Sequence, residues 1–327
     1  MSACLVTGGC GFVGRHLIRR LLEAGHEVHC VDSLVPLSGA VRPERWPLFC
    51  PLDCRTFHFH EEDCRDYFLR NPAARFDYTF HLAAIVGGRE MIERNPLAVA
   101  EDLAIDAGYW KWAVGARPAQ SVVFSSSAAY PTEFQRAEGY RLLREDMIAF
   151  EESVGVPDMT YGWAKLTNEY LARLARERHG LASVVYRPFS GYGEDQDESY
   201  PFPSICRRIL RERGAPVIRV WGSGRQMRDF IHIDDCVDGV LRTMDQVQDA
   251  SAVNLSTGIY TSFAAFVKLG ASLCGFNPEV VGSTDKPEGV FARAGDTALQ
   301  RKLGFAPAID LRTGIARALE LLSGQRP

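Results

Sequence analysis

A glycine-rich turn near the start of the chain lies between an apolar segment and an amphipathic one. The turn reads Thr-Gly-Gly-Cys-Gly-Phe-Val-Gly over residues 7–14 and follows the apolar residues 3–6. Apolar side chains then recur at helical spacing over residues 13–22. In such a strand–turn–helix unit, glycines let the backbone approach a pyrophosphate, whose charge meets the N–H groups at the helix N-terminus. The turn therefore predicts a nucleotide-binding strand–helix unit, although its Gly-x-x-Gly-x-x-Gly spacing alone is a weak signal.

An acidic residue ends the next apolar segment. Residues 28–31 are predicted to form a second strand, and Asp32 follows them about 20 residues after the glycines. A carboxylate at this position can bind the adenosine ribose hydroxyls, and it repels a 2′-phosphate. The sequence therefore favours NAD over NADP as the cofactor.

A tyrosine and a lysine four residues apart form a second motif. In a helix, Tyr161 and Lys165 lie on one face, so the ammonium can lie beside the phenol. A nearby positive charge favours phenolate and is expected to lower the pKa of Tyr161, which would make it a general base near neutral pH. Upstream, the apolar residues 122–124 run into the serines 125–127. Serines at the carboxyl end of a parallel strand point into the ligand crevice, where one could hold a substrate hydroxyl against the Tyr161 oxygen.

Short strands alternate with helices through the first half of the chain. Strands are predicted at 3–6, 28–31, 56–60, 78–81, 122–125 and 183–187, with helices at 96–114 and 160–179. This pattern predicts an α/β fold with a doubly wound parallel (Rossmann) sheet. After residue 188 the pattern loosens, with helices near 201–213, 262–275 and 310–323, which indicates a smaller C-terminal α/β substrate lobe. We expect an NAD-binding domain of residues 1–187, to which 228–250 return, and a substrate-binding lobe of 188–227 and 251–327.

With these motifs in order, the chain resembles the extended short-chain dehydrogenase/reductases, the NAD-dependent sugar-nucleotide epimerases and dehydratases. Further matching segments cover nearly the whole chain: 63–66, 81–84, 187–193, 221–224, 228–235, 293–296 and 303–307. The resemblance implies that NAD is bound by Gly8, Gly11, Phe12, Val13, Asp32, Ser33, Asp63, Cys64, Leu82, Ala83, Ala84, Tyr161, Lys165 and Pro188. It also implies that Tyr161 takes a proton from a sugar hydroxyl while the carbon beneath gives hydride to NAD⁺.

The catalytic serine and the reaction follow from the residues after the strand. The resemblance implies one active serine or threonine near the end of this strand. Counting back from Tyr130 places it at Ser126, which we prefer, whereas counting forward along the strand places it at Ser127. The 4,6-dehydratases carry an acidic pair and the UDP-glucuronate decarboxylases a glutamate just after this serine, but here residues 127–129 are Ser-Ala-Ala. Dehydration is therefore disfavoured.

The motifs are most similar to those of the GDP-mannose 3,5-epimerases, over 83–95 and over 287–293. The acid/base cysteine of that group aligns with Ala128, and its lysine has no counterpart in 194–200. We therefore expect epimerisation at carbon 4 through a transient keto-sugar. The alternatives are a 3,5-epimerase-like enzyme acting on a GDP-sugar, a reductase of a keto nucleotide-sugar and, more remotely, a dinucleotide-sensing regulator.

The resemblance implies a GDP- or UDP-linked sugar as substrate. Arg228 and Arg293 could bind its diphosphate, since a guanidinium meets phosphate oxygens in bidentate fashion. Gly87, Gly88 and Arg89 are expected to line the sugar pocket. Ser190 replaces the asparagine that usually contacts phosphate in this family, and we include Ser190 among the expected substrate-binding residues.

Charge and composition limit the partners. A net charge of −4 and a pI near 6.1 argue against nucleic acid or an anionic membrane surface as partners. With no 18-residue apolar run and a strand from residue 3, we expect no membrane span and no signal peptide, hence a cytoplasmic protein. Family members often dimerise through the helices at 96–114 and 160–179, so a homodimer is expected.

Five potential zinc ligands lie in the segment 50–64: Cys50, Cys54, His58, His60 and Cys64. A strand predicted at 56–62 separates them, and the paired spacing of structural zinc sites is missing. We therefore expect no metal site.

Overall fold

The computed structural model describes residues 1–36, 39–283 and 289–324, and its internal contacts divide the chain into two compact units. The first comprises Met1–Ala129, Met159–Arg187 and Val237–Val253. The second comprises Tyr130–Asp158, Pro188–Cys236 and Asn254–Pro327. Residues 287 and 288, which the sequence matched to the 3,5-epimerases, lie outside the described residues.

The first unit is built on a seven-stranded sheet with the order β11-β6-β5-β4-β1-β2-β3. The strands are β1 (Ala3–Thr7), β2 (Glu27–Asp32), β3 (Phe57–Glu61), β4 (Tyr78–His81), β5 (Gln120–Phe124), β6 (Ser183–Pro188) and β11 (Asp249–Leu255). The pairs from β3 to β6 are all parallel. Because the strand order reverses between β1 and β4, this is the doubly wound sheet that the sequence predicted.

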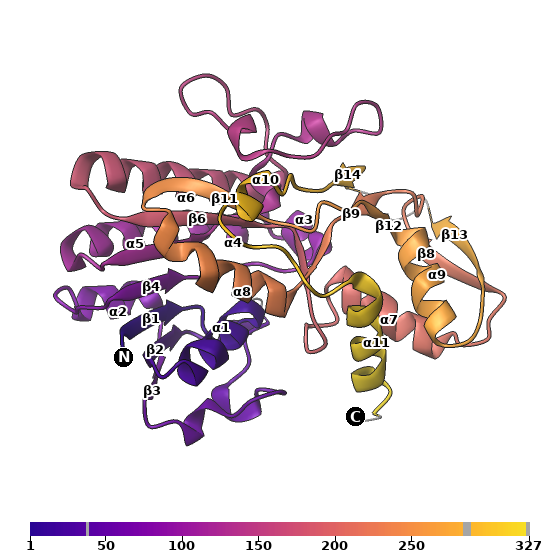
Figure 1. Ribbon diagram of the computed structural model, residues 1–327, viewed down its shortest axis with the longest axis horizontal. Helices are drawn as coiled ribbons and strands as arrows, with labels where there is room; N and C mark the ends of the chain where they lie inside the picture. The colour runs from indigo at the N-terminus through magenta and orange to yellow at the C-terminus, as the bar shows by residue number, and fades with distance from the viewer. Residues whose placement is uncertain (37–38, 284–288, 325–327) are drawn as a thin grey trace. The chain divides into compact units, whose positions relative to one another are not determined.

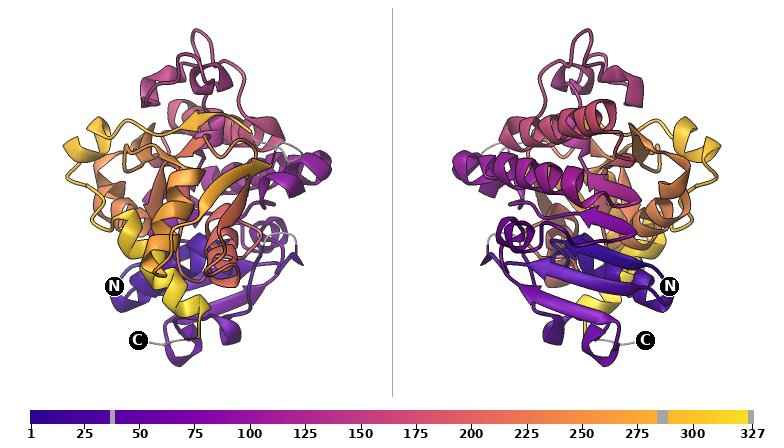
Figure 2. Two further views of the ribbon diagram at one scale, coloured as in Figure 1. Left: turned by 90° about the vertical axis from the view of Figure 1, so that its right-hand side faces the viewer. Right: turned by 90° about the vertical axis from the view of Figure 1, so that its left-hand side faces the viewer.

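Helices cover both faces of this sheet (Figures 1 and 2). On one face lie α1 (Phe12–Glu23) and α8 (Ile233–Thr243), which are joined by an ion pair of 3.3 Å between Arg20 and Asp238. On the other face lie α2 (Cys64–Arg70), α5 (Asp102–Ala116) and α6 (Met159–His179). Their apolar side chains pack on the strands around the buried rings of Tyr109 and Trp112.

The helix predicted over 96–114 is interrupted, so this prediction was wrong in one detail. The structure has α4 (Pro96–Ala100) and α5 instead, with Glu101 between them. The Glu101 N–H bonds to the Ala98 carbonyl at 3.3 Å, three residues back, so the chain tightens by a 3₁₀-type turn at this point. A short α3 (Arg89–Arg94) precedes this pair of helices.

The second unit has a core of its own. It contains a parallel pair, β8 (Val217–Trp221) and β13 (Glu279–Ser283), and the helices α7 (Pro201–Arg211), α9 (Phe263–Leu273) and α11 (Leu311–Leu322). Buried rings of Tyr192, Phe202 and Phe266 pack among these elements. Smaller elements are β7 (Ser190–Tyr192), β9 (Met227–Arg228), β10 (Phe230–His232), β12 (Thr261–Ser262), β14 (Ala292–Arg293) and α10 (Ala298–Lys302).

The segment 130–158 belongs to the second unit, whereas the sequence placed it with the nucleotide-binding domain. Its backbone pairs with residues late in the chain: the Leu143 N–H donates to the Ala294 carbonyl, and the Asp296 N–H donates to the Leu143 carbonyl, both at 2.9 Å. These bonds join positions about 150 residues apart, which no local pattern signals.

Among the residues that the structure describes, no helix is both long enough and apolar enough to cross a membrane.

Candidate active site

The turn after β1 has a geometry that requires glycine. Gly8 has a φ of +68°, and a Cβ at this residue would lie 2.6 Å from the Ala83 nitrogen. A Cβ at Gly14 would lie 2.5 Å from the Gly8 carbonyl oxygen. Because Gly8 and Gly14 have no side chains, residues 82–84 and the first turn of α1 can pack closely against the glycine loop. This places the predicted cofactor residues Gly8, Leu82, Ala83 and Ala84 together.

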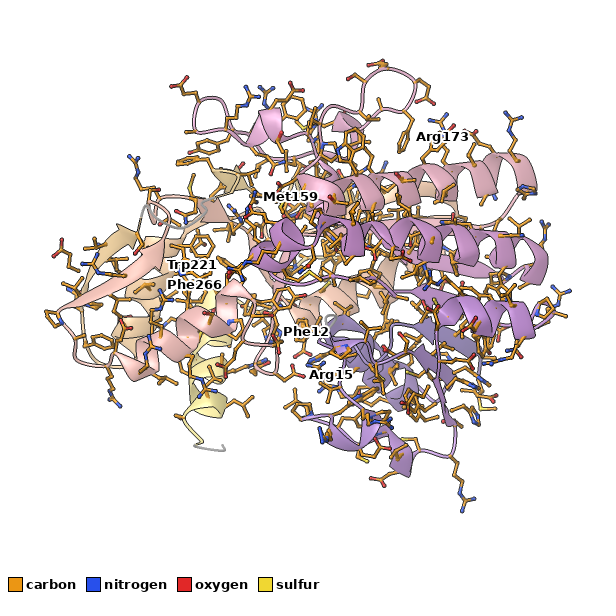
Figure 3. The ribbon with its side chains drawn as sticks, turned by 180° about the vertical axis from the view of Figure 1, so that it is seen from behind. Phe12, Arg15, Met159, Arg173, Trp221 and Phe266 are labelled. Atoms are coloured by element: carbon orange, nitrogen blue, oxygen red, sulfur yellow. The ribbon has the colours of Figure 1, made fainter. Side chains whose placement is uncertain are left out.

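The N-terminus of α1 is open to an anion. Its N-cap is Gly11, no side chain caps its first N–H groups, and its first turn contains no acidic residue. Phe12 and Val13 are the first two residues of the helix, and Arg15 lies over the Phe12 ring at 5.6 Å from the centroid (Figure 3). Backbone N–H groups and the helix dipole both favour negative charge at such a terminus.

Asp32 ties the glycine turn to the end of β2. Its two carboxylate oxygens accept hydrogen bonds from the Cys10 and Leu34 N–H groups at 2.9 and 2.8 Å, and burial raises its pKa. A cavity of ≈ 410 Å³ lies beside it, lined by Ser33, Leu34, Ala40, Val41, Arg42, Arg45 and Glu61.

Asp63 and Cys64 lie at the start of α2. The Asp63 carboxylate caps this helix by accepting the Arg65 N–H at 2.8 Å, and the Arg65 guanidinium holds the pKa of Asp63 below its usual value. Cys64 is buried, which raises the pKa of its thiol to about 12. Pro188 ends β6 and belongs to the second unit.

Tyr161, Lys165 and Ser126 come together in the first unit. The Ser126 hydroxyl hydrogen-bonds the Tyr161 phenol and accepts the Ala128 N–H at 3.1 Å. Ser126 and Tyr161 are partly exposed, whereas Ser127 is buried. The buried ammonium of Lys165 lies 5.6 Å from the centroid of the Tyr161 ring. Helix α6, which carries both residues, begins at Met159 with an unusual φ of +62° (Figure 3).

The pKa of Tyr161 differs from the sequence-based expectation. Burial raises this pKa, and the opposing effects of the Lys165 ammonium and the Ser126 hydrogen bond do not outweigh burial. The carboxylates of Asp102 and Asp106 also raise it. The expected net lowering was therefore wrong, because the sequence indicated neither the burial of the phenol, which is the largest effect, nor the buried carboxylates near the lysine.

Asp102 and Asp106 lie one turn apart in α5 and are both buried. One Asp102 oxygen accepts the Ile85 N–H at 2.6 Å, and burial raises the pKa of Asp102 to about 7. In the described part of the chain, the second carboxylate oxygen of each residue is buried without a hydrogen-bond partner. Burial lowers the pKa of Lys165, but the negative charges of Tyr161, Asp106 and Asp102 outweigh burial and raise it. Lys165 therefore stays a cation across the neutral range.

His81 connects this acidic pair to the glycine turn. Its Nδ1 lies 2.7 Å from the Thr7 hydroxyl, its Nε2 lies 3.1 Å from Asp106, and its ring stacks on Tyr109. His81 is fully buried, and burial lowers its pKa. The sequence analysis did not single out the two aspartates. Two acids four residues apart among apolar side chains were the signal that could have identified them.

The predicted substrate residues are divided between the units. In the first unit, Gly87 and Gly88 precede α3, and Arg89 donates to Glu93 at 2.8 Å. In the second unit, Arg228 donates to the Val290 carbonyl at 2.9 Å and lies over the Phe263 ring.

Two further predicted substrate residues lie in the second unit. The Ser190 N–H donates to the Asp229 carbonyl at 2.9 Å. Arg293 donates to Gln135 at 2.6 Å and forms an ion pair of 2.7 Å with Asp158. The Arg293 guanidinium is therefore already held by side chains of the segment 130–158.

The sequence of this chain matches the model of one protein family, described as the NAD dependent epimerase/dehydratase family, over residues 4–256. The chain belongs to that family. As a member of the epimerase/dehydratase family, it is an enzyme, and NAD is the cofactor that the family description names, as the sequence predicted. The glycine cradle and the open N-terminus of α1 fit a dinucleotide.

Relatives extend the likeness along the whole chain. UDP-glucose 4-epimerase of Mycolicibacterium smegmatis is 28% identical, with 97% of each chain aligned. GDP-mannose 3,5-epimerase 1 of Oryza sativa subsp. indica is 25% identical, over 95% of this chain and 79% of that protein. The crystal structure of UDP-glucose 4-epimerase from Thermotoga maritima with UDP-glucose has the same fold, with a TM-score of 0.84, 24% identity and coverage of 98% and 99% of the two chains.

Proposed function

We propose that this family member is a nucleotide-sugar 4-epimerase that acts through a transient keto-sugar. The observation that carries the proposal is the grouping of Ser126, Tyr161 and Lys165 beside a turn, Ser127–Ala129, that contains neither a carboxylate nor a cysteine. These three side chains can remove the proton of one sugar hydroxyl and so support hydride transfer from the carbon that bears it. They provide no acid or base for the neighbouring carbons.

The cofactor would lie along the carboxyl ends of the strands. Gly8, Gly11, Phe12 and Val13 would bind the pyrophosphate, and Asp32 and Ser33 the adenosine ribose. Asp63, Cys64, Leu82, Ala83, Ala84 and Pro188 would complete the site, with Tyr161 and Lys165 at its nicotinamide end. When bound, NAD⁺ supplies the acceptor that takes hydride from the sugar and later returns it.

Tyr161 would take the proton of the sugar hydroxyl and give it back when the hydroxyl is restored. Because the pKa of Tyr161 is raised, the phenol needs the positive charge of Lys165 beside it before it can accept a proton. Ser126 would hold the same hydroxyl and share the proton through its hydrogen bond to the phenol. Asp102 and Asp106 would keep Lys165 charged and in position.

The substrate we propose is a UDP- or GDP-linked sugar, in keeping with the two relatives. Gly87, Gly88 and Arg89 would line the sugar pocket, and Ser190, Arg228 and Arg293 would contact the diphosphate. We also propose a cytoplasmic homodimer that pairs through α6, where Trp163 and Tyr170 are 47% and 44% exposed two turns apart.

A 3,5-epimerase-like reaction on a GDP-sugar is the second candidate, supported by the likeness to the rice enzyme. It needs groups that move protons at carbons 3 and 5. Ala128 offers none, and Glu194 is engaged with His232 at 3.3 Å. A reductase of a keto nucleotide-sugar would use the same Ser126 and Tyr161. A dinucleotide-sensing regulator has no need of these groups.

The reaction can be tested by running the purified enzyme in D₂O with UDP-, GDP- and CDP-sugars and reading the products by proton NMR. A hydride carried on the cofactor does not exchange with water, whereas a proton removed beside a ketone does. We expect the carbon 4 epimer without deuterium. Deuterium at carbon 3 or 5 would contradict our proposal and support the 3,5-epimerase-like reaction instead.

A further inference from the structure

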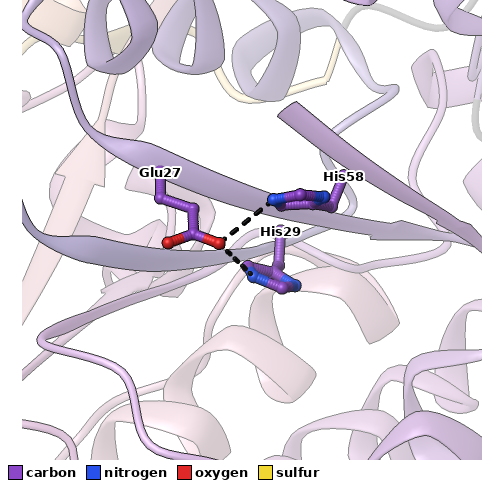
Figure 4. A group of neighbouring side chains, drawn as sticks. All are labelled: Glu27, His29 and His58. Carbon is purple, nitrogen blue, oxygen red and sulfur yellow. Dashed lines mark hydrogen bonds and ion pairs between the residues drawn. The ribbon is translucent and has the colours of Figure 1, made fainter. Parts of the chain in front are cut away.

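Four polar side chains line one face of β2 and β3, at the edge of the central sheet. The strands pair with His29 opposite His58 and with Val31 opposite His60. Because side chains alternate along a strand, Glu27 and His29 share a face of β2, and His58 and His60 share the matching face of β3. Figure 4 shows Glu27, His29 and His58 turned toward one another.

The spacing of these groups matches a tetrahedral metal site. The Glu27 carboxylate oxygen Oε1 lies 3.4 Å from His29 Nε2 and 3.1 Å from His58 Nε2, and the three atoms lie within 4.8 Å of one another. With zinc bonds of about 2.0–2.1 Å to nitrogen and oxygen, neighbouring ligands of a tetrahedral ion lie about 3.3 Å apart. A small shift of the His58 ring would bring all three atoms to bonding distance of one ion.

Two further features fit a metal. His29 Nδ1 lies 3.2 Å from His60 Nε2, so the second ring nitrogen of a ligand is held by a polar neighbour, as in most histidine metal sites. Glu27, His29 and His58 keep 37%, 25% and 41% of their side-chain surface exposed, so an ion and a water ligand can reach them.

We propose that Glu27, His29 and His58 bind one Zn²⁺, with water as the fourth ligand and His60 orienting the ring of His29. The site joins the edge strand β3 to β2 and stabilises the folded sheet. Glu27 begins β2 and Asp32 ends it, about 16 Å away, so the ion takes no part in the hydride chemistry. The spacing within 50–64 had led us to expect no metal site, and the proposed site departs from that expectation because the partners of His58 come from β2.

The test uses the tag-free, full-length enzyme, stripped with EDTA, in a Cys50→Ser/Cys54→Ser background. Cys50 is exposed and Cys54 partly so, and their replacement removes accessible thiols that would also bind zinc. Titration calorimetry with ZnCl₂ should give one site, and zinc but not Mg²⁺ should raise the Tm. Co²⁺ in place of zinc should give the visible spectrum of a tetrahedral ion without thiolate charge transfer.

Variants identify the ligands. His29→Gln and His58→Gln should each weaken zinc binding at least ~10-fold, and His60→Gln about 10-fold. Glu27→Gln keeps an oxygen that can accept both imidazole N–H groups, so it preserves a purely hydrogen-bonded cluster while removing the charge that binds zinc. His179→Gln, on the exposed end of α6, is the matched control and should bind zinc as the parent does. The proposal is overturned if the parent binds no zinc or if Glu27→Gln binds it with unchanged affinity.

Discussion

Arg187 and Glu169 form a buried bidentate ion pair, with Nη2 of the arginine 2.6 Å from Oε2 of the glutamate and Nε 2.9 Å from Oε1. The Ser125 hydroxyl donates to the same carboxylate. This single carboxylate therefore fixes the end of β6, the serine turn after β5 and the middle of α6. Tyr161 and Ser126 face each other because the elements that carry them are joined in this way.

Removing the carboxylate of this pair should be strongly destabilising. Glu169→Ala leaves the Arg187 guanidinium buried without its counter-ion, so the free energy of unfolding should fall by about 3–5 kcal/mol. Urea unfolding followed by circular dichroism measures the change. Glu177→Ala removes an exposed i,i+4 partner of Arg173 on the same helix and should change stability by less than about 0.5 kcal/mol. Equal effects in the two variants would contradict the role given to Glu169.

Tyr161→Phe should abolish proton transfer and leave the fold intact. The substitution keeps the ring and removes only the phenolic oxygen, so turnover should fall at least ~100-fold at unchanged Tm. Tyr170→Phe, on the exposed side of the same helix, is the control and should retain full turnover. An active Tyr161→Phe enzyme would rule out the mechanism.

The two serines should behave differently. Ser126 is partly exposed and hydrogen-bonded to Tyr161, so Ser126→Ala should lower kcat by roughly 10- to 100-fold. Ser127 is buried in the turn, so Ser127→Ala should retain most of the activity. Steady-state kinetics of both variants at one pH compares their kcat values. A larger loss of kcat in Ser127→Ala than in Ser126→Ala would identify Ser127 as the catalytic serine.

Asp102 should make stability depend on pH. Its pKa is about 7 in the folded enzyme and about 3.9 in an unfolded chain, so the folded state holds the extra proton between these values. The free energy of unfolding should therefore fall as the pH rises from about 4 to about 7, and Asp102 should account for roughly 4 kcal/mol of this fall at most.

Asp102→Asn should flatten this dependence, because the amide keeps an oxygen for the Ile85 N–H but does not titrate. Urea unfolding at about pH 5 and about pH 8 compares the two proteins. The same loss of stability in both would show that Asp102 stays ionised beside Lys165.

Asp32 should control the affinity for NAD. A charged hydrogen bond contributes about 1.5–3 kcal/mol, so Asp32→Ala should weaken NAD binding about 10- to 100-fold. Titration of the nucleotide-free enzyme measures this change. Asp53→Ala, at an exposed position of the same unit, should bind NAD normally. NADP in the nucleotide extracted from the purified enzyme would contradict the prediction.

The sequence predicted the features that depend on local patterns. The glycine turn, the strands β1 to β6 and the Tyr161–Lys165 helix each have periodicity or spacing that one segment contains. Their assembly into a doubly wound sheet follows, because strands that alternate with helices pair in parallel.

The features that were missed depend on pairs of distant residues. The partners of His58 lie on β2, and their approach is set by the register of two strands rather than by any spacing within 50–64. The raised pKa of Tyr161 depends first on burial of the phenol and then on the carboxylates of Asp102 and Asp106, which come from another helix. The placement of 130–158 depends on backbone bonds to residues 291–296. Long-range contacts of this kind leave no trace in a local window of sequence.

The discontinuous first unit also has a consequence for synthesis of the chain on the ribosome. The polypeptide leaves this unit after Ala129, returns at Met159, leaves again after Arg187 and contributes its last strand, β11, only at Asp249–Leu255. Ser126 and Tyr161 therefore emerge before the strand that borders β6 has been made. The nascent nucleotide-binding unit therefore remains incomplete until Val253 has been translated, and during that interval its partly built sheet is exposed to chaperones.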